Sequence, residues 1–251
     1  MASDEPSRSD RSSLDENLPN DVGRLVREAF VATLSTLDQG TGHPYASLVE
    51  VATTPNGKPI LLLSRLARHT RNLGADARSS LLFDSRTFTD NPMAASRVTL
   101  VGTIEIASEA SIGARFLRRH PGARLYADFA DFAFWHVRPS SAHFVGGFGR
   151  ITELAAAELW PPSGVDSGFE AAVAAAEARL LSEIEVRCEA AGSPWRPTGI
   201  DAGGLDVVDR SGGQRRAMRL NFEARAAVIE DVARSAERAV ARLAAGSPAS
   251  R

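Results

Sequence analysis

Hydrophobic residues in the first part of the chain recur mostly at alternate positions or in short β-branched runs, a pattern that favours β-strands. Val31–Leu37 alternates apolar and polar residues as a half-buried strand does, and Asn56-Gly57 supplies hairpin-turn chemistry. The sequence predicts about six strands before residue 155, over Val31–Leu37, Tyr45–Thr54, Pro59–Ser64, Ser79–Ser85, Arg97–Ala107 and the bent aromatic run Phe132–Ile151.

Helical spacing is confined to short segments in this region. Helices are expected after a cap at Asn20 or Asp21, over Ala67–Gly74 and over Ser111–His120. Consecutive antiparallel strands with few crossover helices are typical of a barrel rather than of a doubly wound sheet. The expected fold class is therefore α+β, with an antiparallel β-barrel.

The hydrophobic pattern changes after the proline- and glycine-containing stretch Trp160–Gly164, which predicts a linker. Beyond it comes a long helix, then two strands at Gly204–Asp209 and Arg215–Phe222, and a final helix. The predicted organisation is a disordered tail at 1–19, a barrel domain at 20–157, a linker at 158–166, an α-β-β-α domain at 167–246 and a tail at 247–251.

Composition and charge narrow the class of protein. Of the 251 residues, 43% are hydrophobic and 24% are charged, which fits a packed core. The net charge of −2 argues against nucleic acid as the main partner, because phosphate neutralisation needs a basic face. No apolar run reaches the ~20 residues that span a bilayer, and the polar N-terminus lacks a signal-peptide core. We therefore expect a cytoplasmic protein with no membrane partner.

A polar cluster stands where the third strand gives way to a helix. Ser64 ends the strand, and Arg68, His69 and Thr70 fall in the first helical turn. Free backbone N–H groups and the helix dipole favour an anion at such a place, and guanidinium and imidazole groups add donors suited to phosphate. A solvent-exposed helix start without a ligand fits the same pattern. Both interpretations stay open.

A second candidate segment lies in the aromatic run. Trp135, Arg138 and His143 offer an apolar ring, a cation and a titratable group, although the neighbouring phenylalanines fit core or dimer packing. The glycines of Gly146–Arg150 predict a bulge rather than a nucleotide-binding loop, because no βα unit follows them. The histidines do not stand at metal-ligand spacing, and Cys188 is the only cysteine, so no metal site is predicted.

Three segments together resemble the pyridoxamine 5′-phosphate oxidase-related split barrels: His43–Val49, Ser64–Phe83 and Gly146–Ile151. Within that family, the run after Ser64 is similar to the serine–leucine–alanine–histidine–threonine–asparagine–leucine pattern of the heme-utilisation, HugZ-like branch. Gly199–Asp209 resembles the small C-terminal domain that is often fused to this branch.

The resemblance implies an antiparallel split β-barrel of the FMN-binding type and a homodimer that holds FMN at the subunit interface. Arg68 and His69 match an Arg-Lys pair that holds the phosphate in flavin-binding relatives, and Trp135 and Arg138 match a segment that reaches the partner's flavin. The implied cofactor-binding residues are Ser47, Ser64, Arg68, His69, Thr70, Trp135 and Arg138.

Three functions remain open. The first is an FMN-dependent oxidoreductase, in which the protein positions the cofactor. The second is a heme-binding, heme-degrading protein with an axial ligand from His120, His136 or His143. The third is a non-catalytic binding or regulatory module. Phe169–Glu185 contains no histidine, so this helix lacks the paired histidines that many fused relatives carry there.

Overall fold

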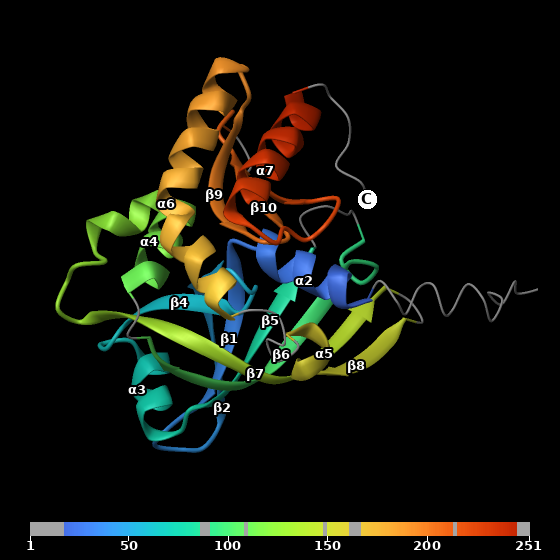
Figure 1. The fold of residues 1–251 in the computed structure, drawn as a ribbon. Helices are drawn as coiled ribbons and strands as arrows, with labels where there is room; N and C mark the ends of the chain where they lie inside the picture. The colour runs from blue at the N-terminus through green and yellow to red at the C-terminus, as the bar shows by residue number, and fades with distance from the viewer. Residues whose placement is uncertain are drawn as a thin grey trace, which may run out of the picture.

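A curled antiparallel sheet forms the larger part of the protein (Figure 1). The structure is a computed structural model that describes residues 18–85, 91–107, 110–147, 150–160, 167–212 and 215–244. The sheet runs in the order β2-β1-β5-β6-β7-β4-β3, and β8 pairs with β7. Its strands are β1 (Val31–Leu37), β2 (Pro44–Glu50), β3 (Ala52–Thr53), β4 (Pro59–Ser64), β5 (Arg78–Asp84), β6 (Ser96–Ile106), β7 (Phe132–Gly146) and β8 (Ile151–Ala155).

The alternation along the strands places one side of the sheet inside the barrel. In β1, Ala32, Leu34 and Thr36 are buried, while the residues between them are half-buried or exposed. Side chains of one strand point alternately to the two faces, so the buried set fills the interior and the other set forms the outer face. The predicted α+β fold with a curled antiparallel half-barrel is confirmed.

The sheet contains more strands than the about six expected from the pattern. The predicted strand Tyr45–Thr54 is interrupted at Val51, whose amide donates to the Phe30 carbonyl, and so becomes β2 and β3. The aromatic run divides into β7 and β8, and the chain turns at Gly147, where φ is +94°. Residues 148–149 of this predicted bulge lie outside the described residues.

Helices close the barrel from two sides. They are α2 (Leu18–Glu28), α3 (Arg68–Ala75), α4 (Ala110–Arg119), the 3-10 turn η2 (Pro121–Leu125) and α5 (Ala156–Leu159). Helix α2 inserts Leu18, Val22 and Val26 into the barrel core. Helix α4 and η2 instead cover the outer face of β4, where Phe116 and Ile60 belong to a second apolar cluster. The rest of the outer face stays open to solvent.

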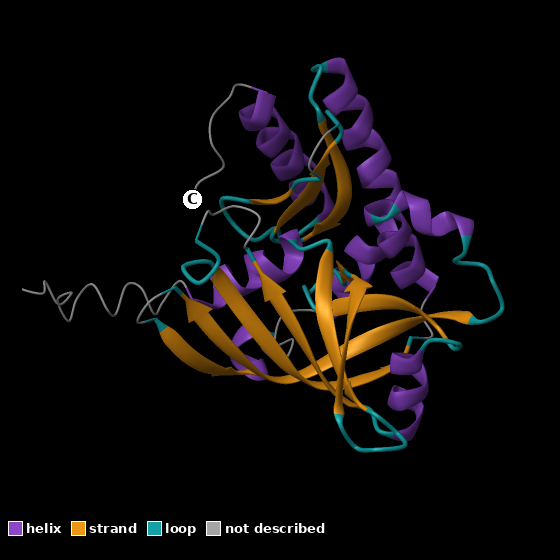
Figure 2. Cartoon of the chain, turned by 180° about the vertical axis from the view of Figure 1, so that it is seen from behind, coloured by secondary structure: helices purple, strands orange, loops and turns teal. Residues whose placement is uncertain are grey.

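A smaller α/β unit follows the barrel (Figure 2). It contains α6 (Ser167–Ala190), β9 (Trp195–Asp201), β10 (Gly204–Asp209), β11 (Ala217–Asn221) and α7 (Ile229–Ala244). The sheet order is β11-β10-β9, and an apolar cluster joins the sheet to α6 and α7. The unit has one strand more than the predicted α-β-β-α domain, because β9 was not expected from the sequence.

Parts of the predicted domain boundaries fall outside the described residues. Residues 1–17 of the expected tail at 1–19 are not described, and α2 begins at Leu18. The expected linker at 158–166 overlaps the end of α5, and residues 161–166 are not described; nor is the tail at 247–251. None of the described helices combines the length and the apolar composition needed to cross a bilayer.

Candidate functional site

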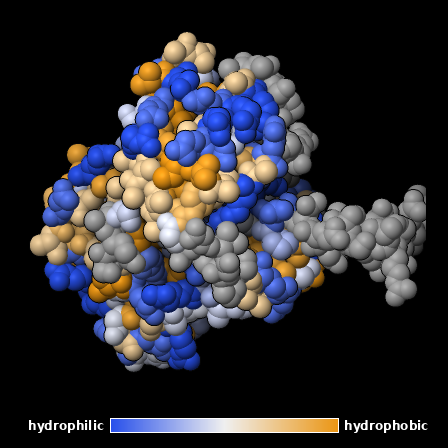
Figure 3. Space-filling view, viewed as in Figure 1, coloured by the Kyte–Doolittle hydropathy of each residue, from blue (hydrophilic) through white to orange (hydrophobic). Residues whose placement is uncertain are grey.

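The junction of β4 and α3 carries most of the residues that the sequence singled out. Ser64 is the last residue of β4, and Arg68, His69 and Thr70 form the first turn of α3. Ala67 precedes the helix in an extended conformation and provides no side-chain cap. The first N–H groups of the helix therefore have no side-chain cap acceptor. Figure 3 shows hydrophilic and hydrophobic residues mixed on the surface at this end of the barrel.

Arg68 is bound by a carboxylate instead of standing free for a phosphate. Its Nε donates to Asp38 Oδ2 at 2.8 Å, and its Nη2 lies 2.7 Å from the same oxygen. The guanidinium also lies 4.8 Å from the centroid of the Tyr45 ring. Hydrogen bonds from Arg68, followed by those from Thr41, lower the pKa of Asp38, so this carboxylate is ionised at neutral pH. A phosphate at this place has to compete with Asp38.

Ser47, His69 and Thr70 form the inner side of the same junction. Ser47 Oγ and His69 Nδ1 are hydrogen-bonded at 3.0 Å. Burial lowers the pKa of His69, so its ring is neutral at pH 7 and adds no positive charge. The buried hydroxyl of Thr70 has no hydrogen-bond partner in the structure. This orphaned oxygen is a site where a bound polar ligand would gain a hydrogen bond.

Ser64 is hydrogen-bonded to the loop that leads into β7. Its hydroxyl donates to Asp131 Oδ2 at 2.5 Å and accepts from the Leu66 amide at 3.1 Å. The first contact joins the β4–α3 turn to the chain before Phe132, and the second lies within the turn itself. They leave Ser64 in a structural role at the edge of the junction.

Trp135 and Arg138 lie on opposite faces of β7 and away from α3. Trp135 is 6% exposed and packs in the barrel core, where its indole N–H has no partner. Arg138 points to the outer face, is 62% exposed and pairs with Glu105 at 2.5 Å. The seven predicted site residues are therefore distributed over the α3 junction, the core and the outer face.

A groove of about 590 Å³ opens on the outer face of the barrel, around Arg138. Its volume lies within the roughly 300–1,000 Å³ range of small-molecule and cofactor sites. Hydroxyl side chains and a few apolar side chains form its floor. The lining residues are Ser35, Thr36, Leu37, Pro44, Arg78, Ser79, Ser80, Val101, Gly102, Thr103, Arg138 and Ser140.

The pairing register of the strands explains why the groove is open and why two arginines flank it. Arg78 pairs with Thr103, and Thr103 pairs with Arg138, so the arginines flank one threonine across β5, β6 and β7. With neighbouring strands ~4.8 Å apart, the two arginine Cα atoms stand roughly 10 Å apart. The next row of the face contains Ser80 and Val101, whose side chains are shorter than those of the two arginines, so the groove is open there. The result is a shallow floor with a positive rim.

The positions of the histidines limit which of them can reach this groove. His120 is 1% exposed and its Nε2 lies 2.7 Å from the Val51 carbonyl, so it is held inside the protein. His143 points to the outer face beside Glu153, on the far half of β7. His136 lies two residues before Arg138 and therefore on the same face of β7. His136 is the histidine of the predicted set that lies beside Arg138.

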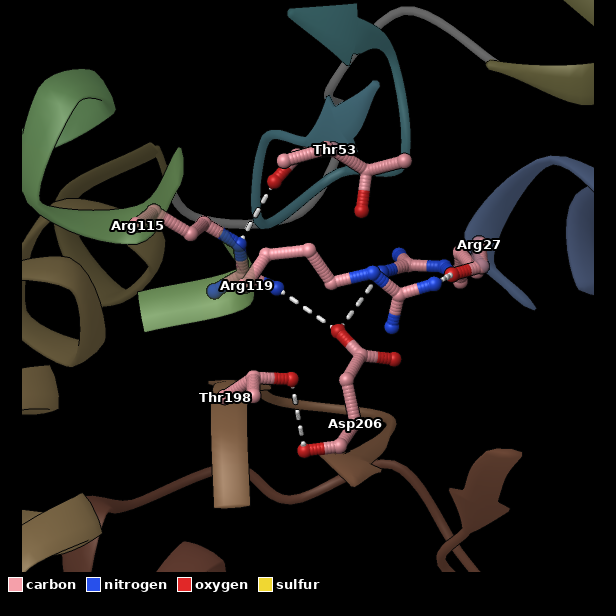
Figure 4. Close-up of a pocket in the computed structure, with 7 residues that line it drawn as sticks. Arg27, Thr53, Arg115, Arg119, Thr198 and Asp206 are labelled. Carbon is pink, nitrogen blue, oxygen red and sulfur yellow. Dashed lines mark hydrogen bonds and ion pairs between the residues drawn. The ribbon is translucent and has the colours of Figure 1, made fainter. Parts of the chain in front are cut away.

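A second hollow lies between the barrel and the C-terminal unit, and it is far smaller (Figure 4). Its volume is about 10 Å³, which is enough for one water molecule and not for a cofactor. Three arginines reach it from α2 and α4, and Asp206 reaches it from β10. This hollow is part of the contact between the two units rather than a ligand site.

No sequence motif singles out Arg78, Ser35, Ser80 or Val101 as a site residue. Each is an ordinary exposed or half-buried strand residue, and none lies in a motif. Only the pairing register of β1, β5 and β6 brings them into one groove. The alternation of apolar and polar residues along each strand could have identified these residues, because it assigns them to the outer face of a barrel.

Comparisons with known proteins identify the family of the barrel and its fold. A family model described as "CREG, beta-barrel" matches residues 21–160. The chloroplastic non-canonical heme oxygenase HOZ of Arabidopsis thaliana is 34% identical over 131 residues, which cover 51% of this chain and 40% of that protein. The match thus spans less than half of the relative's own length.

Two solved structures extend the likeness to most of the chain. A protein of unknown function from Agrobacterium tumefaciens aligns over 96% of this chain and 100% of its own, with a TM-score of 0.71 and 22% identity, which is a likeness of fold. A heme-binding protein from Mycobacterium smegmatis aligns over 91% of this chain and 97% of its own, with a TM-score of 0.54 and 27% identity. The split-barrel resemblance is confirmed, while membership of the HugZ-like branch stays a prediction.

Proposed function

Because the chain belongs to the CREG β-barrel family, we propose that it is a heme-binding split-barrel protein that holds heme in the groove on the outer face of its sheet. The observation that carries the proposal is the groove itself, with Arg78 and Arg138 on one row and an apolar and hydroxyl floor beside them. The names of the plant relative and of the mycobacterial structure support heme over FMN as the ligand.

The residues of the groove fit the chemistry of a heme. A porphyrin is flat and largely apolar, which suits a floor containing Leu37, Pro44 and Val101. Its two propionates need cations, and guanidinium groups bind carboxylates in a bidentate manner. Arg78 is now paired with Asp76 and Arg138 with Glu105, both at the surface. Exposed pairs of this kind are weak, so a propionate can replace the carboxylate.

His136 is the residue that we assign to the iron, because it lies two positions from Arg138 on the same strand face. Neutral imidazole is a common axial ligand of heme. Bound heme would supply the iron centre for oxygen chemistry, and the protein would supply binding and orientation. The name of the plant relative supports heme degradation as the reaction.

Hemin titration of the purified protein tests this function. We expect a saturable Soret band, and we expect Arg78→Gln and Arg138→Gln each to weaken hemin binding roughly tenfold through the loss of a charge-assisted contact. His136→Ala should shift the Soret position of bound hemin while leaving the affinity for iron-free protoporphyrin unchanged. Arg179→Gln, at an exposed pair on α6, is the matched control and should bind as the wild type does.

FMN is the second candidate ligand, and a specific observation favours it. The unpartnered Thr70 hydroxyl lies in the first turn of α3, next to the Ser47–His69 pair. Saturable binding of FMN together with failure to bind hemin would overturn the heme proposal. Such a result would support the oxidoreductase interpretation, with Arg68 released from Asp38 to hold the phosphate.

We also propose a homodimer formed by the outer face, with the cofactor at the subunit interface. This face exposes large apolar side chains, including Leu48 at 73% and Val101 at 46%. A second copy would bury them and cover the groove. We also propose that the protein is cytoplasmic.

Sedimentation analysis tests the dimer. We expect a stable dimer at micromolar concentration, and we expect Leu48→Glu to produce monomers because it places a charge in the apolar interface. Leu125→Glu is the matched control, since Leu125 is 80% exposed on η2 and no residue of η2 lines the groove. A wild-type protein that sediments as a monomer contradicts the proposal.

A further inference from the structure

The C-terminal end of α4 is capped by two arginines from the small unit. Arg196 of β9 donates to the Arg118 carbonyl at 2.7 Å, and Arg215 donates to the Arg119 carbonyl at 3.0 Å. The acceptors belong to consecutive residues of one helix, so the two guanidiniums lie within about 10 Å of each other. The negative end of the helix dipole favours cations at this place.

These arginines belong to a larger group, the basic cluster, which consists of Arg118, Arg119, Arg124, Arg196 and Arg215. Burial lowers the pKa of Arg196 and Glu185 opposes this shift, while the cations Arg210, Arg215 and Arg124 lower the pKa further. Arg196, Arg215 and Arg124 are therefore within electrostatic reach of one another. Arg124 and Arg215 are exposed, and Arg118 and Arg196 are half-buried. The cluster therefore presents positive charge at the seam between the barrel and the small unit.

Ion pairs neutralise only part of the basic cluster. Among the described residues, Glu177 is the one carboxylate that comes within ion-pair distance of the cluster, and it pairs with Arg118. Arg119, Arg196 and Arg215 are held by backbone carbonyls, which fix a guanidinium without cancelling its charge. The protein as a whole carries a net charge of −2, so this concentration of positive charge is a local feature.

The guanidiniums are also held in place before any partner arrives. Arg119 and Arg215 each lie 4.3 Å from the centroid of the Phe30 ring. Arg119 is further fixed by hydrogen bonds at 2.9 Å to the carbonyls of Arg27 and Ala29. Side chains that are already ordered lose little entropy on binding, which favours affinity for a matching anion.

We propose that the basic cluster is a docking surface for an acidic segment of another protein, in which Asp and Glu side chains contact Arg124, Arg196 and Arg215. The planar fork of arginine matches a carboxylate in a bidentate manner. The cluster lies on α4, η2, β9 and the chain before β11, whereas the heme groove lies on β1, β5, β6 and β7. The two proposals can therefore fail independently.

Nucleic acid fits this surface less well than an acidic peptide does. A polyanion that extends beyond the cluster meets a protein of net negative charge. The aromatic ring inside the cluster, Phe30, is half-buried and occupied by two guanidiniums, so it is not free to stack on a base. A short run of carboxylates matches the size of the cluster without these costs.

The test is a titration of the full chain with a fluorescent oligo-glutamate peptide, followed by anisotropy at low and at physiological salt. We expect saturable binding that weakens with salt, about tenfold weaker binding for Arg215→Gln and about threefold weaker binding for Arg124→Gln. Arg124 is exposed and makes no side-chain hydrogen bond or ion pair within the described part of the chain, so we expect its substitution to leave the fold intact. Arg179→Gln is the control and should not change the affinity.

Three results would overturn the proposal. Unchanged peptide affinity in both variants means that the basic cluster does not bind the peptide. Tighter binding of a single-stranded oligonucleotide of equal charge means that the surface serves nucleic acid. A change in the sedimentation coefficient of Arg124→Gln, without a change in peptide affinity, means that the cluster contacts a second copy of this chain.

Discussion

Replacing Asp206 by alanine is expected to lower the free energy of unfolding by about 3–5 kcal/mol, because it leaves buried guanidiniums without their shared carboxylate. Asp206 Oδ2 lies 2.8 Å from Arg115 Nη2 and 3.5 Å from Arg27 Nη1, and its Oδ1 lies 3.1 Å from Arg219 Nη1. All four side chains are at most 13% exposed. Chemical denaturation followed by circular dichroism measures the effect.

Two comparison variants separate charge from packing. Asp206→Asn keeps the size of the side chain and should destabilise nearly as much as alanine, since the missing charge is the cause. Glu183→Ala removes an exposed carboxylate that pairs with Arg179, and it should lower the free energy of unfolding by less than about 0.5 kcal/mol. An Asp206→Asn protein as stable as the wild type would show that the arginines do not need this charge.

The effect of Asp206 should also depend on pH in a definite direction. Burial alone would raise the pKa of this carboxyl, but Arg219, Arg27 and Arg115 together hold it below its usual value. A folded-state pKa below the unfolded value of about 3.9 contributes stability that is complete above that pH. The gap between wild type and variant should therefore persist at neutral pH and shrink only as the pH falls below about 4.

Replacing Gly102 by alanine is expected to lower the free energy of unfolding by about 3 kcal/mol, at the upper end of overpacking effects. A Cβ atom at this position would lie 2.1 Å from the Arg138 carbonyl oxygen and 2.8 Å from Pro139 Cα. Both are backbone atoms at the β6–β7 register shift, so rotation of a side chain cannot relieve the overlap. The strands have to separate beside the groove, and hemin binding should weaken in parallel.

Gly23→Ala is the matched control for this substitution. Gly23 lies inside α2, and nothing comes within 4 Å of a Cβ atom built there. Because alanine is a better helix former than glycine, this substitution should raise the free energy of unfolding by up to about 1 kcal/mol. Equal effects at the two glycines in thermal or chemical denaturation would show that backbone contact at Gly102 is not the cause.

Local sequence signals were enough to predict much of the barrel. Gly57, at the predicted hairpin turn between β3 and β4, has a φ of +85°, which glycine adopts without strain. The alternation in Val31–Leu37 correctly marked a strand with one buried face. Such features depend on neighbouring residues, and so they can be read without knowing the fold.

Strand β9 was missed for a physical reason. Trp195–Asp201 contains Pro197 and Gly199, which both weaken a strand and argue against one in a sequence. The structure accommodates them because β9 is an edge strand and its register with β10 shifts near Pro197. An edge position has no second neighbour that needs the missing N–H group.

The candidate site was only partly foreseen, because long-range pairing decides it. The arginine predicted to bind phosphate, Arg68, meets Asp38, which lies thirty residues earlier in the chain. Arg115 lies in a helix that the sequence predicts, and nothing in the pattern distinguishes it from the other arginines there. In the structure it is 3% exposed and is held by Glu177 and Asp206 from the other unit. Charged residues are rarely buried, so a single sequence gives no reason to expect this.

The double role of α2 has a consequence for the order in which the protein assembles during synthesis. This helix fills the barrel core with one face, and its other face contributes Arg27 and Glu28 to contacts with residues 179 and 191 positions later. The ribosome therefore releases β10 and β11 long after α2. Until then, Arg27 lacks the carboxylates that neutralise it in the finished protein. We therefore expect the barrel to close around α2 before the small unit docks, with Arg27 unpaired by these carboxylates until β9 and β10 emerge.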